Sequence, residues 1–242
     1  MKIIFMPKLV IDIETVGKNM DGLDNISQDY FKHWAESEAN DEAKTEFELK
    51  KIEDGFSFSP LTAEVVCIGM FNPDSKKGVM YYQNPAEPHK KFEDQNVQIE
   101  AMSEADMLKK FWDYVKLYDE FITFNGRAFD IPFLIIRSAV HQIKPSKNLM
   151  SNRYLSNQFT GARHVDLQDQ LKFYGAVYGR GYNLHMYCQA LGIKSPKSQG
   201  VSGAHVKEMF INGRYDDIAR YNINDLYATA ELYKIWQEFI NI

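Results

Sequence analysis

The sequence predicts an α/β fold in which a mixed central sheet is flanked by helices. Apolar runs typical of strands are concentrated in the first half of the chain, and apolar spacings typical of helices fill the second half. A length of 242 residues with 45% hydrophobic side chains is sufficient for one large core. Because we find no internal repeat and no low-complexity linker, we expect a single domain over residues 1–242.

The first expected strand contains two acidic residues in an otherwise apolar run, Lys8-Leu9-Val10-Ile11-Asp12-Ile13-Glu14-Thr15. Side chains alternate along a strand, so Asp12 and Glu14 point to the same side. Neighbouring carboxylates in a buried strand lose hydration and repel each other, and hard divalent cations such as Mg²⁺ or Mn²⁺ compensate for both effects. In the alternative interpretation the strand ends at Ile11 and both acids face water.

Residues 18–58 interrupt the apolar pattern with a polar, strongly charged segment. Phe31 and Trp34, and later Phe47 and Ile52, have the spacing of helical residues. We therefore expect a mostly helical insertion at about 18–58, packed on the edge of the domain. The simplest interpretation of this insertion is a solvated helical face without a function of its own.

The remaining elements follow from apolar periodicity and from turn residues. Strands are expected at 63–71, 78–83 and 120–125, the first two joined by a turn at 72–77, and 164–167 is expected to be a short strand or a turn. Helices are expected at 103–117, 133–140, 168–178, 184–191, 204–211 and 215–239. Ser103 followed by Asp106 resembles a capping box at the start of the first of these helices.

Composition limits the classes of function. A net charge of −5 and a pI of about 5.7 argue against a basic protein that coats nucleic acid, but they allow an enzyme that binds nucleic acid locally. The two cysteines, Cys67 and Cys188, have no zinc-like spacing and indicate no disulfide framework, which is typical of a reducing cytoplasm. The apolar stretch at the start is too short for a signal peptide, and no run reaches transmembrane length. We therefore expect a cytoplasmic protein without membrane contact.

A second acidic site lies in the run Asn125-Gly126-Arg127-Ala128-Phe129-Asp130-Ile131-Pro132. A strand is expected to end at Asn125, Gly126 permits a tight turn, and a helix is expected to begin near Asp130. Pro132 is tolerated in the first helical turn, where its missing N–H has no intrahelical partner. In the alternative interpretation Asp130 is simply the N-cap of this helix.

A third site lies in the last helix, where Tyr221 and Asp225 are four residues apart. Residues at this spacing share one face of a helix. The alternative is a surface aspartate and a half-buried tyrosine on an ordinary amphipathic helix.

Together, the three segments resemble the DEDD exonuclease superfamily, whose fold is RNase H-like. Asp12 and Glu14 match its first motif, Asp130 its second, and Tyr221 with Asp225 the YxxxD third motif of the DEDDy branch. Within the superfamily the chain resembles the predicted 3′–5′ exonucleases related to the proofreading domain of B-family DNA polymerases. The resemblance also includes 60–69 and 200–206, so it covers most of the chain except the insertion.

The resemblance implies a metal-dependent 3′–5′ exonuclease that releases nucleoside monophosphates from single-stranded ends, with DNA slightly preferred. It implies two divalent ions, Mg²⁺ or Mn²⁺, with Asp12 as the bridging ligand. Glu14 and Asp225 would complete the site that activates water, and Asp130 would hold the other ion through water. Tyr221 would position the attacking water rather than act as a strong base, because tyrosine titrates near pH 10.

The resemblance also suggests substrate contacts. The backbone near Thr15 is expected to meet the terminal nucleotide, Asn125 to orient the second motif or touch the substrate, and Phe129 to stack on a base. Phe129 could instead be a core aromatic, and Asp166 either supports the site or caps a helix.

The expected partner is a single-stranded DNA or RNA 3′ end. Any proofreading role would need a separate polymerase or repair protein, because no polymerase domain is present. The alternative functions are an RNA-trimming 3′–5′ exoribonuclease and a catalytically silent nucleic-acid-binding module. Clustered acids disfavour the silent module, because without metal they repel phosphate.

Overall fold

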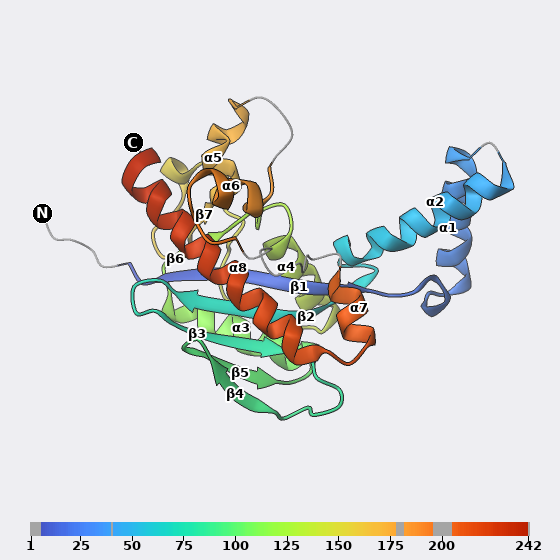
Figure 1. The fold of residues 1–242 in the computed structure, drawn as a ribbon, viewed down its shortest axis with the longest axis horizontal. Coiled ribbons are helices and arrows are strands. Elements are labelled where there is room, and N and C mark those ends of the chain that lie inside the picture. Colours follow the sequence, from blue (N-terminus) through green and yellow to red (C-terminus); the bar gives the residue numbers. More distant parts are fainter. Residues whose placement is uncertain (1–5, 40, 178–181, 196–204, 242) are drawn as a thin grey trace, which may run out of the picture.

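A seven-stranded mixed sheet forms the centre of the computed structural model, which describes residues 6–39, 41–177, 182–195 and 205–241 (Figure 1). The strands are β1 (Lys8–Gly17), β2 (Ala63–Asn72), β3 (Lys77–Tyr82), β4 (Lys91–Asp94), β5 (Val97–Ala101), β6 (Glu120–Thr123) and β7 (Arg163–Asp166). Their order in the sheet is β4-β5-β3-β2-β1-β6-β7. β1 pairs antiparallel with β2 and parallel with β6, so the strand with the first two acids lies inside the sheet.

Helices cover both faces of the sheet, which confirms the predicted α/β architecture (Figure 1). They are α1 (Asn25–Glu38), α2 (Glu42–Asp54), α3 (Glu104–Tyr114), α4 (Asp130–Val140), α5 (Leu167–Leu171), α6 (Leu184–Ala190), α7 (Val206–Ile211) and α8 (Tyr215–Ile235). Short 3₁₀ or π turns are η1 (Met20–Gly22), η2 (Gly55–Phe58), η3 (Val115–Leu117), η4 (Leu155–Asn157), η5 (Phe173–Gly175) and η8 (Trp236–Ile240). α8 crosses one face and packs with α5 and α7, whereas α3 and α4 cover the other face. No helix in the described ranges combines the length and apolarity needed to span a bilayer.

The alternation of β1 determines where its acids point. Leu9, Ile11 and Ile13 belong to the core beneath α3 and α4. Asp12 and Glu14 occupy the alternate positions and therefore face α8. The strand continues to Gly17, so the alternative in which it ends at Ile11 is wrong.

The segment between β1 and β2 contains α1 and α2, which extend beyond the end of β1 and away from the sheet (Figure 1). Our expectation that these helices pack on the domain edge is therefore wrong for most of their length. The segment is fastened at its two ends, because the Gly17 N–H donates to Ser57 Oγ (2.9 Å) and the Lys18 N–H donates to the Thr62 carbonyl (2.9 Å).

Two regions differ from the sequence prediction. No strand was expected between 84 and 102, where β4 and β5 form a hairpin at the sheet edge. The expected helix at 168–178 ends at Leu171, because Phe173 and Tyr174 adopt positive φ angles of 48° and 55°. The helix expected at 204–211 corresponds to α7, which begins at Val206. Residues 200–204 of the resembling segment lie outside the described residues.

Candidate active site

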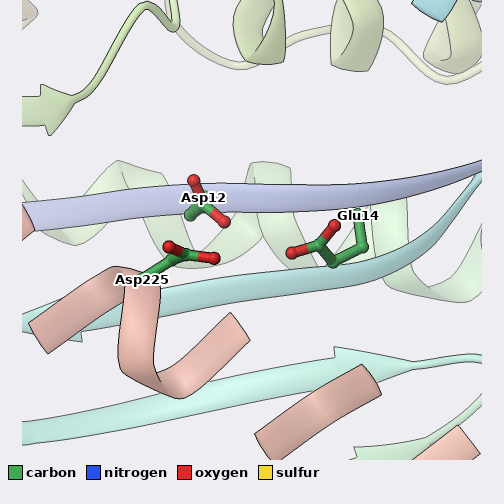
Figure 2. Close-up of side chains that lie close together, drawn as sticks. All are labelled: Asp12, Glu14 and Asp225. Atoms are coloured by element: carbon green, nitrogen blue, oxygen red, sulfur yellow. The ribbon is translucent and has the colours of Figure 1, made fainter. Parts of the chain in front are cut away.

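Three of the predicted acids converge between β1 and α8 (Figure 2). Asp12, Glu14 and Asp225 each offer a carboxylate oxygen, and these oxygens all lie within 4.8 Å of one another. They line a cleft of about 340 Å³. The other residues that line it are Ile13, Phe124, Asn125, Phe129, Asp130, Gln168, Tyr182, Asn183, Leu184 and Tyr221. None of the described residues lining the cleft is a lysine or an arginine, so no lining side chain offsets the negative charge.

The fourth acid, Asp130, approaches the same strand from α4. Its Oδ1 accepts a hydrogen bond from the backbone N–H of Ile13 (3.1 Å), the residue between Asp12 and Glu14. Asp130 lines the cleft but lies outside the group of three close oxygens. It is the first residue of α4, and the N-cap is Phe129, so the alternative role of Asp130 as N-cap is wrong.

Asp166 fixes the loop that presents Asp130. Its carboxylate accepts the backbone N–H groups of Asn125 (2.9 Å) and Arg127 (2.9 Å). The same carboxylate caps α5 by accepting from the N–H groups of Gln168 and Asp169. The role of Asp166 as a helix cap is therefore confirmed, and its support of the site acts through the 125–127 loop. Asn125 has a φ of 64°, a conformation that asparagine tolerates better than most residues.

Tyr221 lies on the same face of α8 as Asp225, as its spacing predicts. Its side chain lines the cleft, and its hydroxyl donates a hydrogen bond to the Asp225 carboxylate. Burial raises the pKa of Tyr221 far above its usual range, and the neighbouring carboxylates raise this pKa further. The hydroxyl is therefore neutral at physiological pH and lies with the acids, not in solvent.

The predicted substrate contacts occupy different places. Asn125 and Phe129 line the cleft. Phe129 also packs against Phe133, with a ring-centroid distance of 5.4 Å, so it is both a core residue and a cleft residue. Thr15 is buried and does not line the cleft, and its hydroxyl donates to the Ser57 carbonyl (2.6 Å). Only the backbone near Thr15 therefore remains a candidate for contact with the substrate.

The sequence analysis missed Asn222, which contacts two of the acids. Its Nδ2 lies 2.6 Å from Asp12 Oδ2 and 3.5 Å from Glu14 Oε1, and the residue is fully buried. Gly69 lies opposite Asp12 in β2, and a Cβ there would lie only 2.0 Å from Asn222 Oδ1. The signal for Asn222 is a polar residue in the apolar stripe of α8, four residues from both Ile218 and Leu226.

Burial and mutual repulsion disfavour the charged forms of Asp12, Glu14 and Asp130. Burial raises the pKa of Asp12 and of Glu14 well above their usual ranges, and the other carboxylates of the cleft raise both pKa values further. Burial likewise raises the pKa of Asp130 to about 7. Carboxylate oxygens are the ligands that Mg²⁺ and Mn²⁺ prefer, and a bound cation offsets this repulsion. The residues present therefore fit divalent metal ions.

The raised pKa of Asp130 gives an expected pH dependence of stability. With a pKa of about 7 in the folded protein and 3.8 as the ordinary value, the folded state binds the proton more tightly. This stabilising contribution is complete below pH 4 and is lost as the pH rises through 7, a loss on the order of 4 kcal/mol. In chelator, Asp130→Asn should therefore raise the Tm at pH 8 far more than at pH 5, and Mn²⁺ should raise the wild-type Tm at pH 8. Equal Tm gains at both pH values, or a gain for the exposed control Asp29→Asn, would contradict this assignment.

Asn222 should affect metal affinity more than stability. Partners that hold metal ligands in place typically contribute 10- to 100-fold to metal affinity. We expect Asn222→Ala to weaken Mn²⁺ binding, measured by isothermal titration calorimetry, by roughly that factor. Asn224→Ala is the control, because Asn224 lies in the same helix and its side-chain amide donates to the Arg220 carbonyl (3.1 Å). An unchanged Mn²⁺ affinity in Asn222→Ala would show that the contact with Asp12 is only structural.

Comparisons with known proteins agree with this geometry. Residues 82–240 match the family described as predicted 3′–5′ exonuclease related to the exonuclease domain of PolB. This match includes Asp130, Tyr221 and Asp225 and begins after β1. An uncharacterized protein from Methanocaldococcus jannaschii is 31% identical over 154 residues, which are 60% of this chain and 81% of the relative.

A solved structure shares the fold. The family B DNA polymerase from the hyperthermophilic archaeon Pyrobaculum calidifontis matches 96% of this chain with a TM-score of 0.58 and 16% identity. This chain spans 24% of that polymerase, and at this identity the likeness shows the fold alone. The fold is therefore RNase H-like, as predicted, and is similar to that of the exonuclease domain of PolB. Because the family match covers more than half of the sequence, the chain belongs to the family of predicted 3′–5′ exonucleases related to the exonuclease domain of PolB.

Proposed function

We propose that this protein is a metal-dependent 3′–5′ exonuclease of the DEDDy type that hydrolyses single-stranded nucleic acid from its 3′ end. The observation that carries the proposal is the convergence of Asp12, Glu14 and Asp225, with the Tyr221 hydroxyl on Asp225, in one cleft. Family membership supports the reaction. We further propose that residues 1–242 form one exonuclease domain and that the protein acts in a reducing cytoplasm.

The acids would hold two Mg²⁺ or Mn²⁺ ions. Asp12 would be shared between them, Glu14 and Asp225 would complete one site, and Asp130 would hold the second ion through water. Bound there, the ions would supply an activated water and stabilise charge on the leaving oxygen. Without bound cations, the same carboxylates repel a phosphodiester, so substrate binding and metal binding are linked.

The chain's own groups would orient the reacting atoms. The neutral Tyr221 hydroxyl would hydrogen-bond the attacking water beside Asp225. The Asn222 amide would keep Asp12 and Glu14 in one arrangement. Asn125, Phe129 and the backbone near Thr15 would contact the terminal nucleotide.

DNA is the proposed substrate over RNA because the family is related to an exonuclease domain of DNA polymerases. An RNA-trimming activity would use the same cleft, and the test below distinguishes the two substrates.

The test is hydrolysis of single-stranded DNA and RNA oligonucleotides labelled at either end, with Mg²⁺, Mn²⁺ or chelator. We expect the 3′ label to appear first as a mononucleotide, the 5′-labelled strand to shorten stepwise, and chelator to stop both. Faster cleavage of RNA than of DNA would indicate an exoribonuclease and contradict the proposed preference for DNA. Binding without cleavage in either metal would instead indicate a catalytically silent module.

A further inference from the structure

An exposed aromatic residue, Phe58, lies beside the cleft at the end of η2. It is 70% exposed, and its ring centroid is 6.3 Å from that of Phe129 in an edge-on arrangement. Phe129 forms part of the cleft wall next to Asp130. Phe58 therefore extends the aromatic wall of the cleft outward while leaving most of its own ring open.

The backbone that carries Phe58 is fixed to the strand that carries the acids. Thr15, which follows Glu14, donates from Oγ1 to the Ser57 carbonyl (2.6 Å), and the Gly17 N–H donates to Ser57 Oγ (2.9 Å). The contact is so close that a Cβ at Gly17 would lie 2.6 Å from the Ser57 nitrogen. Phe56, two residues before Phe58, is buried. Phe58 is thus held at a defined distance from the acids, and ordering its ring on binding costs little entropy.

The rest of the neighbouring segment disfavours nucleic acid. Residues 18–58 contain eleven acidic side chains and five lysines. A phosphate backbone would be repelled along α1 and α2, so contact with a strand is restricted to the end of the segment, where Phe58 lies.

We propose that Phe58 is a stacking platform for an unpaired base upstream of the 3′-terminal nucleotide. The proposal rests on the proposed function, and in it the strand would leave the cleft over the Phe129 rim. An aromatic ring accepts any base, so the contact would be insensitive to sequence. A base within a duplex already has both faces stacked, so the platform would favour single strands.

The test is the affinity for a fluorescein-labelled single-stranded DNA oligonucleotide, measured by fluorescence anisotropy with Ca²⁺ in place of Mg²⁺. We expect Phe58→Ala to raise Kd about tenfold and Phe58→Trp to retain wild-type affinity. Phe47→Ala, at a 66% exposed position on α2, is the matched control and should leave Kd unchanged. Because Phe58 is mostly exposed, its variants should melt at the wild-type temperature.

Strands that lack one base test whether Phe58 contacts a base, and at which position from the 3′ end. An abasic site at the second or third position from the 3′ end should weaken wild-type binding by the same factor as Phe58→Ala, and should weaken the Phe58→Ala variant no further. An abasic site at the tenth position should change neither. Wild-type affinity in Phe58→Ala, additive losses, or no binding of the intact strand by wild type would overturn the proposal.

A second readout separates this proposal from the proposed function. Hydrolysis of the 4-nitrophenyl ester of thymidine 5′-monophosphate with Mn²⁺ needs the acids but no upstream base, so Phe58→Ala should leave this rate unchanged. A reduced rate in this variant would contradict a platform role. If the wild-type protein does not hydrolyse the ester or the labelled strands, the exonuclease proposal fails, and the anisotropy comparison still decides the role of Phe58.

Discussion

Asp12→Asn is expected to lower kcat on a single-stranded oligonucleotide on the order of 10³-fold. Asp12 lies close to the other acids of the cleft. Burial raises the pKa of Asp12 most, and the charges of Asp130, Asp225 and Glu14 raise it further. The amide keeps the shape of the side chain but removes the charge that would attract two cations. The measurement is single-turnover cleavage of a 5′-labelled strand at saturating Mg²⁺.

The same substitution should stabilise the metal-free protein. Removing one of several buried, mutually repelling carboxylates relieves their repulsion, so the Tm of Asp12→Asn in chelator at pH 8 should equal or exceed that of wild type. The control is Glu231→Gln, an exposed position on α8 paired with Lys234, which should change neither the rate nor the Tm. Wild-type turnover by Asp12→Asn would refute the assignment of the cleft as a metal-dependent active site.

Tyr221→Phe is expected to lower kcat roughly 10²-fold with little change in KM or Tm. The substitution removes one oxygen from a buried ring and leaves its packing in α8 intact. The lost oxygen is the donor to Asp225, so the loss should appear in the chemical step. The measurement is kcat and KM on the same oligonucleotide, with Tm from thermal melting.

Tyr227→Phe is the matched control for Tyr221, because it removes a hydroxyl from the same helix. The Tyr227 hydroxyl donates to the Gln95 carbonyl (2.5 Å), away from the cleft. We expect wild-type kinetics from this variant. Unchanged kcat in Tyr221→Phe would remove the tyrosine from the reaction and with it the DEDDy assignment.

Local sequence patterns predicted the features that depend on local physics. Alternation in β1 placed Asp12 and Glu14 on one face, and helical spacing placed Tyr221 with Asp225. Ser103 is the N-cap of α3, because its Oγ accepts from the Asp106 N–H (3.2 Å). The Asp106 carboxylate accepts from the Ser103 hydroxyl (2.6 Å), so the pair has the residues of a capping box but a different second bond. Each of these relations spans only a few residues, so periodicity is sufficient to predict it.

Contacts between segments that are far apart in the sequence could not be predicted from local patterns. The hydrogen bond from Ile13 to Asp130 joins residues 117 positions apart, and no local pattern reports it. Asn222 depends on the space above Gly69, which exists only once α8 packs on β2. β5 did carry a signal, an alternation from Val97 to Ala101, but β5 and its neighbour β4, the edge strand, are short and contain charged side chains.

The 18–58 segment joins two neighbouring strands, so its length can vary without a change in the sheet. Gly17 and Ala63 are directly paired across β1 and β2, so topologically everything between them is the loop of one hairpin. The register of the sheet is set by the strands on either side, and the entropic cost of loop closure grows only slowly with loop length. Relatives can therefore differ widely in α1 and α2, from a long projecting arm to a tight turn, while the acids on β1 keep the same positions.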